Sequence, residues 1–172
     1  MYKIRPEREE DIQEIKQMND DAFCQENEAK LIAEIRSSDG FIPELSLVAL
    51  GDTGNIIGHI LFSSIHIQTQ NNKIAALALA PMAVSPQMQN KGIGSALVRD
   101  GLIRSKMLGY KSVIVLGHPL FYAKFGFKPA IEYGIKPPFE VRDEVFMALE
   151  LEQGSLEQAA GTVVYPPAFS NV

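Results

Sequence analysis

The chain has 172 residues, of which 46% are hydrophobic and 22% charged, a composition typical of a globular protein with a real hydrophobic core. Its formal net charge of −5 disfavours nucleic acid or an anionic membrane surface as the main partner. The chain start has no signal-peptide pattern, no apolar run reaches the roughly 18 residues of a membrane span, and the single Cys24 cannot form an intrachain disulfide, so we expect a cytoplasmic protein.

The first 36 residues predict a short strand followed by two helices. Residues 2–5 alternate like a strand, which Pro6 is expected to end. Residues 7–20 carry an apolar stripe at helical spacing, and acidic residues crowd the start of this segment, where a helix dipole favours them. A break at residues 21–27 separates this helix from a second one that ends at Arg36.

From residue 46 onward the pattern changes to strands. Residues 47–50 and 56–67 predict two strands of an antiparallel meander, and a polar turn leads to an apolar run at residues 74–84. The near-continuous apolar character of this run indicates a central strand covered on both faces. Pro81 lies inside it, although proline cannot donate to a sheet ladder. We therefore expect the strand to splay from a neighbour there and to offer backbone groups to an extended ligand.

A glycine turn follows this central strand. The run Gln89-Asn90-Lys91-Gly92-Ile93-Gly94 stands before a helix predicted from Gly92 to Gly109. Strand, glycine turn and helix together direct backbone N–H groups and the positive end of a helix dipole at an anion. The turn lacks the third glycine of a dinucleotide fingerprint and the Gly-Lys-Ser/Thr of a P-loop. Taken alone, it is also compatible with a helix that merely packs closely on a strand.

The rest of the chain predicts one more strand and a short helix. Residues 112–116 are fully apolar and follow a crossover helix, so this strand should run parallel to the central one. A short helix opens at Pro119 and closes at Gly126. Residues 161–169 are mostly apolar, and we expect them to form an arm docked on the domain or on the second subunit of a homodimer.

Two motifs, in this order along the chain, resemble signatures of the Gcn5-related N-acetyltransferase (GNAT) family. Gln-x-x-Gly-Ile-Gly at residues 89–94 is similar to the acyl-coenzyme A signature, and Tyr-Ala-Lys-Phe-Gly-Phe at residues 122–127 to the second signature. The resemblance covers residues 1–151, including a final strand at residues 144–151. It implies an α/β fold with a mixed, twisted sheet of about seven strands, flanked by four helices and splayed at its centre. Residues 152–172 would be a C-terminal extension, which looks like the tail of a subgroup of small bacterial N-acetyltransferases.

The resemblance implies direct transfer of an acetyl group from acetyl-CoA to a primary amine of a small molecule or peptide. The pantetheine arm would pair with the backbone of Met82, Ala83 and Val84, and a backbone N–H, from Met82 or a neighbour, would polarise the thioester carbonyl. Tyr122 would protonate the leaving thiolate, because a phenol with a pKa of about 10 is protonated at neutral pH. The pyrophosphate would lie along the turn and the helix start, at Gln89, Asn90, Lys91, Gly92, Ile93, Gly94, Ser95 and Ala96.

The sequence leaves the general base open. Many family members carry a glutamate on the central strand or its neighbour, whereas residues 74–84 contain no carboxylate. Glu28, in the loop region that borders the acceptor site in relatives, is the candidate we select. The other candidates are Glu26, His59, His66 and His118, the histidines because their pKa lies near neutrality. A chain of water molecules would serve equally well. No metal is expected, because the His and Cys residues show no ligand spacing.

Two other functions stay open at this point. The chain could be a module that binds or senses acyl-CoA with little turnover, or an interaction protein with a vestigial coenzyme site. The acceptor is also open: an acidic chain tolerates cationic amines such as polyamines, aminoglycosides or lysine side chains, and a small-molecule α-amino group fits equally well.

Overall fold

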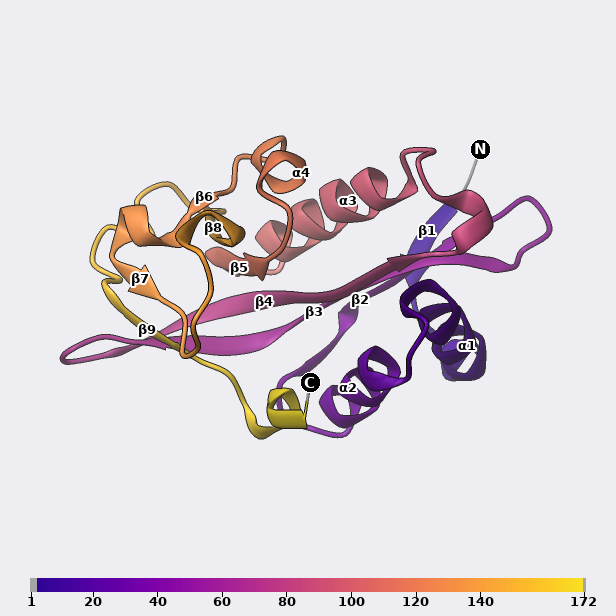
Figure 1. Ribbon diagram of the computed structural model, residues 1–172, viewed down its shortest axis with the longest axis horizontal. Helices are drawn as coiled ribbons and strands as arrows, with labels where there is room; N and C mark the ends of the chain where they lie inside the picture. Colours follow the sequence, from indigo (N-terminus) through magenta and orange to yellow (C-terminus); the bar gives the residue numbers. More distant parts are fainter. Residues whose placement is uncertain (1–2, 172) are drawn as a thin grey trace.

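The computed structural model describes residues 3–171, and nine strands in this part of the chain form one mixed sheet. The strands follow one another in the order β1-β2-β3-β4-β5-β8-β6, and β9 pairs with both β3 and β7. Helices α1 and α2 cover one face of the sheet, and α3 and α4 lie on the opposite face (Figure 1). The expected α/β architecture with four helices is confirmed, and the sheet has two strands more than the seven or so expected, since β6 and β7 are two-residue strands.

The elements are as follows. The strands are β1 (Lys3–Pro6), β2 (Phe41–Leu50), β3 (Ile56–Gln68), β4 (Lys73–Val84), β5 (Ser112–Leu116), β6 (Lys128–Pro129), β7 (Ile135–Lys136), β8 (Phe146–Glu150) and β9 (Gly161–Val164). The α-helices are α1 (Ile12–Phe23), α2 (Asn27–Arg36), α3 (Ile93–Met107) and α4 (Pro119–Ala123). The 3₁₀ turns are η1 (Glu9–Asp11), η2 (Pro86–Met88), η3 (Ala130–Tyr133), η4 (Asp143–Val145) and η5 (Pro167–Asn171).

The sheet is splayed at its centre, between β4 and β5. These two strands are parallel and pair only from Leu77 to Leu79 on β4, opposite Val113 to Val115 on β5. Beyond Leu79, β4 continues to pair antiparallel with β3 as far as Val84, with a register shift where residues 80 and 81 of β4 face the single residue Leu61 of β3. The strand that the sequence predicts as central therefore has one partner over its second half, and the expected splay is confirmed.

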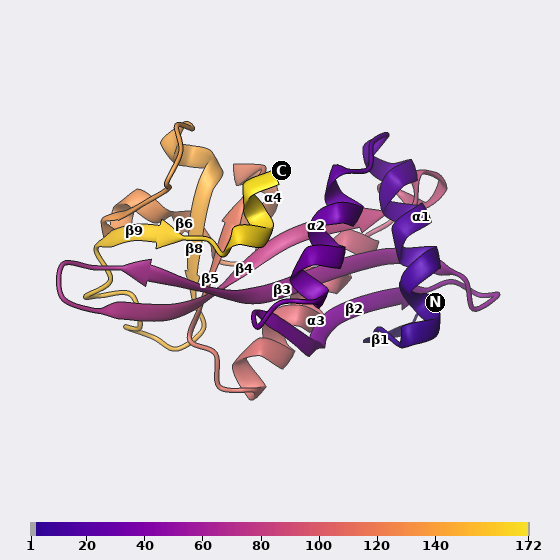
Figure 2. The ribbon, with the colours of Figure 1, turned by 90° about the horizontal axis from the view of Figure 1, so that it is seen from below.

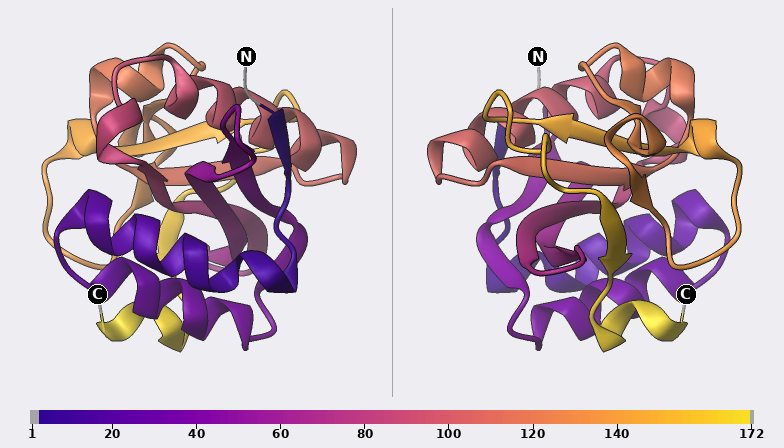
Figure 3. Two further views of the ribbon diagram at one scale, coloured as in Figure 1. Left: turned by 90° about the vertical axis from the view of Figure 1, so that its right-hand side faces the viewer. Right: turned by 90° about the vertical axis from the view of Figure 1, so that its left-hand side faces the viewer.

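Apolar side chains fill the space on both faces of the sheet. Under α3, Phe62 of β3 packs with Leu97, and a Cβ on Gly101 of that helix would lie 2.2 Å from the Phe62 ring. Glycine at this position lets the helix approach the sheet. Under α1 and α2, which cross the other face (Figure 3), Ile15 and Ile32 pack on Leu61. These two layers fix β3 and β4 between the helix pairs.

Several boundaries at the N-terminal side differ from the predicted ones. Residue 2 lies outside the described residues, and β1 continues through Pro6, which pairs with Leu47; β1 is an edge strand, where proline is tolerated. Helix α1 extends to Phe23, beyond the predicted end at residue 20. Strand β2 begins at Phe41 and not at residue 47, because Pro43 and a register shift between Phe41 and Ser46 disguise its first half.

The C-terminal residues are part of the sheet. Strand β9 pairs antiparallel with β3, with Val163 opposite Ile67, and its Gly161 is so close to β3 that a Cβ there would lie 2.1 Å from the Gln68 carbonyl oxygen. After β9 the chain turns under the molecule, and η5 lies beside α2 (Figures 1 and 2), where Ala168 joins the core of that face. The tail thus docks on its own chain. A second subunit and a domain boundary at residue 151 stay predictions.

A buried polar network ties β2, β3 and α2 together at the sheet edge near β1. Arg36 donates two hydrogen bonds to the Glu7 carboxylate, at 2.8 and 3.1 Å, and the Ser46 hydroxyl donates to the same carboxylate. The fully buried His59 lies 2.9 Å from the Ser46 oxygen through Nε2. Burial alone would raise the pKa of Glu7, but the contacts with His59, Arg36 and Ser46 outweigh burial and lower that pKa to about 2.

This network predicts acid-sensitive stability. Because the folded pKa of Glu7 lies below its ordinary value of 4.5, its contribution is complete above pH 4.5 and is lost as the pH falls toward 2. We expect Glu7→Gln to lower the free energy of unfolding by roughly 3 kcal/mol at pH 7, and this gap to narrow below pH 4.5. Urea unfolding at a series of pH values measures it. The exposed Glu9→Gln serves as the control and should change stability by less than about 0.5 kcal/mol. If the difference in the free energy of unfolding between the wild type and Glu7→Gln does not change with pH, the ionised Glu7 carboxylate is not the source of the stability.

Candidate active site

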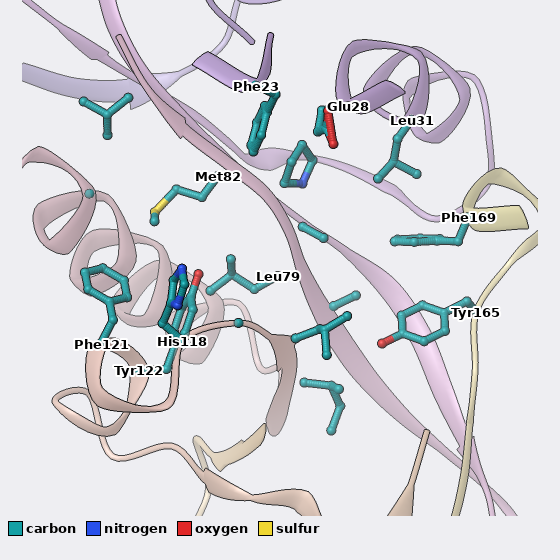
Figure 4. Close-up of a pocket in the computed structure, with 18 of the residues that line it drawn as sticks. Phe23, Glu28, Leu31, Leu79, Met82, His118, Phe121, Tyr122, Tyr165 and Phe169 are labelled. Atoms are coloured by element: carbon teal, nitrogen blue, oxygen red, sulfur yellow. The ribbon is translucent and has the colours of Figure 1, made fainter. Parts of the chain in front are cut away.

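The splayed strands open onto a cavity of about 1540 Å³. Its walls come from the second half of β4, the turn into α3, the segment from β5 to α4, the start of α2 with Phe23 before it, and the C-terminal segment from β9 to η5 (Figure 4). This volume exceeds the roughly 300–1,000 Å³ of a site for a single small ligand, so it can hold two ligands side by side.

The edge of β4 facing this cavity carries backbone groups that β3 does not use. The Ser85 N–H donates to the Ile57 carbonyl of β3 at 2.9 Å. Because backbone groups point alternately to the two sides of a strand, the N–H and C=O of Val84 and Met82 point away from β3, and those of Ala83 point toward it. Met82 and Val84 line the cavity, whereas the Ala83 side chain is buried under α1 and α2. An extended ligand can therefore pair with Met82 and Val84, and Ala83 has no access to it.

The glycine turn closes one end of the cavity with the start of α3. Gly92 is the N-cap residue in the left-handed conformation, at φ 85°, and no side chain caps the helix. The first N–H groups of a helix have no partner within it, so those of Ile93, Gly94 and Ser95 are directed outward together with the positive end of the dipole. Anions bind at such a place. The Gln89 amide donates to the Val84 carbonyl at 3.2 Å and joins the turn to β4.

Most of the residues predicted to bind the coenzyme lie together at this turn and at the adjoining end of β4. Those that line the cavity are Met82, Val84, Gln89, Asn90, Gly92, Ile93, Gly94 and Ser95. Lys91 and Ala96 do not line it. Lys91 is exposed, and the Ala96 N–H already donates to the Gly92 carbonyl at 3.0 Å as part of the helix.

Tyr122 lies on the other side of the opening, on α4. Its ring packs edge-on against Phe121 and Phe127, with centroid distances of 4.9 and 5.6 Å, and it fits because residue 117 is glycine. A Cβ on Gly117 would lie 2.4 Å from the tyrosine ring. Burial raises the pKa of Tyr122 to about 12, so the hydroxyl is protonated at neutral pH and can donate a proton to an anion formed in the cavity.

Two of the five candidate bases line the cavity, namely Glu28 and His118. The Glu28 carboxylate points into the cavity from α2 (Figure 4), and both of its oxygens accept from the Gln25 amide, at 2.9 and 3.0 Å. His118 is the N-cap residue of α4 and precedes Tyr122 by one helical turn.

The other three candidates lie elsewhere. Glu26 is exposed and pairs with Lys30 at 3.8 Å. His59 is enclosed in the Glu7 network under the helices, and His66 lies on the part of β3 that pairs with β9; neither lines the cavity. The position of these five residues along the sequence does not show which of them line the cavity, because that depends on the face of the sheet that each side chain occupies.

The structure adds cavity residues that the sequence did not suggest. Phe139, Tyr165 and Phe169 line the far end, and the first two are stacked with ring centroids 6.1 Å apart. Burial raises the pKa of Tyr165 to about 12, so its hydroxyl is neutral. Phe23 and Leu31 line the side formed by α1 and α2. The run of aromatic residues and prolines at 165–169 was a visible signal, but its place depends on the long-range pairing of β9 with β3.

Within residues 3–171 there is no group of three or more His, Cys, Asp or Glu side chains arranged to hold a metal ion. None of the helices in this part of the chain is both long and apolar enough to cross a membrane.

Comparison with known proteins gives consistent matches. Residues 3–130 match the family model of the GNAT acetyltransferase domain. The uncharacterized N-acetyltransferase YhbS of Escherichia coli K12 is 32% identical to this chain over 149 residues, which cover 87% of each chain. The uncharacterized N-acetyltransferase YjhQ of the same strain is 33% identical over 135 residues, covering 78% of this chain and 74% of YjhQ.

Two solved structures share the whole fold. The crystal structure of E. coli YhbS in complex with CoA has a TM-score of 0.90 and 28% identity, and covers 98% of this chain and 91% of its own. A GNAT family acetyltransferase from Brucella melitensis in complex with acetyl-CoA has a TM-score of 0.79 and 29% identity, with 98% of both chains covered.

The contact between Gly117 and Tyr122 gives a test of the site's packing. Gly117→Ala should force the tyrosine ring to move, and we expect a loss of about 1–3 kcal/mol in the free energy of unfolding, measured by urea titration. In a Tyr122→Ala background the same substitution should cost much less, because the clashing ring is absent. If Gly117→Ala lowers the free energy of unfolding equally in both backgrounds, the contact with the Tyr122 ring is not the reason for glycine at this position.

Proposed function

This chain belongs to the GNAT acetyltransferase family, and we propose that it transfers an acetyl group from acetyl-CoA directly to the primary amine of an acceptor. The observation that carries this proposal is the meeting of three features in one cavity: the unpaired edge of β4, the uncapped start of α3 and the buried Tyr122. An extended, anionic thioester needs all three of them, and the fit of these residues supports acetyl-CoA as the donor.

In the proposed complex, the chain holds the coenzyme mainly through its backbone. The N–H groups of Ile93, Gly94 and Ser95 bind the pyrophosphate, and the Met82 carbonyl and the Val84 N–H pair with the amides of the pantetheine arm, which leaves the Met82 N–H for the thioester. Lys91, exposed beside the turn, contributes its charge from the solvent side. Binding of an anion by local geometry suits a chain with a net charge of −5, which offers no general positive field.

The proposed chemistry uses one group on each side of the opening. A bond forms between the amine nitrogen and the carbonyl carbon while the carbon–sulfur bond breaks. The Met82 N–H stabilises charge on the carbonyl oxygen. Tyr122 gives its proton to the leaving thiolate and regains one from solvent. Glu28 accepts the protons that the nitrogen loses, one as the ammonium becomes the neutral amine and one as the amide forms, and passes each to solvent. Because both reactants are held in one cavity, their loss of translational and rotational entropy occurs on binding and no longer adds to the reaction barrier, which lowers that barrier by roughly 7–11 kcal/mol for well-oriented groups.

We also propose a cytoplasmic location. The support is the single cysteine, Cys24, which is an exposed free thiol and so suits a reducing compartment.

Coenzyme binding is tested by thermal unfolding with and without acetyl-CoA. At 100 times its dissociation constant a ligand stabilises the native state by ~2.7 kcal/mol, which for a chain of this size is a shift of roughly 5–11 °C. We expect this shift with acetyl-CoA and none with ATP or NAD. Ser95→Trp would place a large side chain at the start of α3 and should remove the shift. No shift with acetyl-CoA at saturating concentration would contradict the proposed function.

The role of Tyr122 is tested by Tyr122→Phe. The variant loses the proton donor and keeps the ring, so we expect kcat to fall by about 100-fold or more, measured as release of free thiol, with the thermal shift by acetyl-CoA intact. Tyr133→Phe is the matched control, since Tyr133 lies outside the cavity, and it should keep the wild-type rate. An unchanged rate in Tyr122→Phe would remove this residue from the mechanism.

A further inference from the structure

We propose that the acceptor is a monoamine with an apolar, aromatic or branched aliphatic body, whose ammonium group binds to Glu28. This inference rests on the proposed function and names the acceptor class of the same site. It follows from the far half of the cavity, which is lined by α2 and the C-terminal segment and is distant in sequence from both family motifs.

The first support is the charge state of Glu28. Among the described residues that line the cavity, Glu28 is the sole carboxylate. Its neutral partner Gln25 leaves the negative charge uncompensated, and no described Lys or Arg forms an ion pair with it. Glu26, two residues away, has Lys30 as its partner. An unpaired carboxylate directed into a cavity attracts a cation, and a protonated primary amine donates well to it.

The second support is the aromatic wall, which we define as Phe139, Tyr165 and Phe169. Tyr165 lies between the other two rings, 6.1 Å from the Phe139 centroid and 4.9 Å from that of Phe169. Figure 4 shows the Tyr165 side chain directed into the cavity, with Phe169 beside it and Leu31 on the neighbouring helix. The pairing of β9 with β3 positions Tyr165, which directly follows β9, and Phe139 stacks on it. It offers broad apolar contact with a neutral hydroxyl at its edge.

The third support is the contrast between the two halves of the cavity. The half at α3 presents backbone N–H groups for an anion, and the half at the aromatic wall presents mainly carbon. A second ammonium, as in a polyamine, would lie against the wall with no second carboxylate among the described lining residues to compensate it. A longer acyl chain on the donor would also be apolar, but it would leave Glu28 desolvated with no cationic partner. Both observations favour a monoamine.

The experiment compares two amines of opposite character on the CoA-saturated protein. We expect isothermal titration calorimetry to show 2-phenylethylamine binding at least tenfold tighter than 1,4-diaminobutane, because the aromatic wall rewards an apolar body. Glu28→Gln should weaken 2-phenylethylamine binding by about tenfold or more. Glu26→Gln, an exposed carboxylate outside the cavity, should bind as wild type.

The aromatic wall is tested through Phe139, which is 41% exposed, so that its loss should leave the fold intact. Phe139→Ala should weaken 2-phenylethylamine severalfold and leave both 1,4-diaminobutane binding and the thermal shift by acetyl-CoA unchanged. Equal or tighter binding of 1,4-diaminobutane, or no binding of either amine, would overturn the inference. So would displacement of 2-phenylethylamine by hexanoyl-CoA but not by acetyl-CoA, which would assign the wall to the acyl chain.

The same samples separate this inference from the proposed function. If 2-phenylethylamine binds through Glu28 and the aromatic wall but no thiol is released from acetyl-CoA, the proposed transfer reaction is contradicted, while the inferred class of amine ligand is supported. If thiol is released fastest with 1,4-diaminobutane, the reaction holds and the acceptor class is wrong.

Discussion

The separation of β5 from β4 after Leu79 is the constraint on which the whole site depends. Pro81 has no N–H to donate, and on the opposite strand the register shifts between Ile60 and Phe62 at the same level. From there β4 has a partner on one side only. The exposed polar groups of Met82 and Val84 would be costly in a closed core, and a ligand that pairs with them turns this cost into binding energy. The proline that interrupts the ladder therefore lies where we propose that the coenzyme binds.

Packing on both faces supports the sheet beside the splay. On one face α3 approaches β3 closely because Gly101 has no side chain, and on the other face α1 and α2 pack on Leu61, with Arg36 of α2 bound to the buried Glu7. The tail completes the arrangement. Gly161 lets β9 lie against β3, and η5 then reaches α2, so that the start and the end of the chain close the same side of the cavity. Rigid surroundings of this kind are what a positioned backbone site requires.

The sequence was most informative where the signals are local. The glycine turn at residues 89–94 and the Tyr122 motif each encode a turn or cap whose geometry depends on a few neighbouring residues, and the structure places both at one opening. The histidines show the limit. His59 and His118 are equivalent candidates by residue type, yet one is enclosed beneath α1 and α2 and the other lines the cavity. The aromatic wall was missed for the same reason, since its position follows from the pairing of β9 with β3, across about a hundred residues of chain.

The distribution of groups around the cavity also bears on how a chain without a carboxylate on β4 could manage two proton transfers. Tyr122 stands on the α4 side and Glu28 on the α2 side, with the open edge of β4 between them (Figure 4). In the proposed reaction, one proton leaves the amine toward Glu28 and another reaches the thiolate from Tyr122. Burial raises the pKa of Tyr122 and keeps its phenol neutral, and Glu28 has no ion-pair partner among the described residues. The base therefore need not lie on the strand that binds the thioester. In the proposed reaction a base on α2 acts from the acceptor's side, and the carboxylate that attracts the ammonium group also removes its protons. Under this proposal acceptor choice and catalysis depend on one residue.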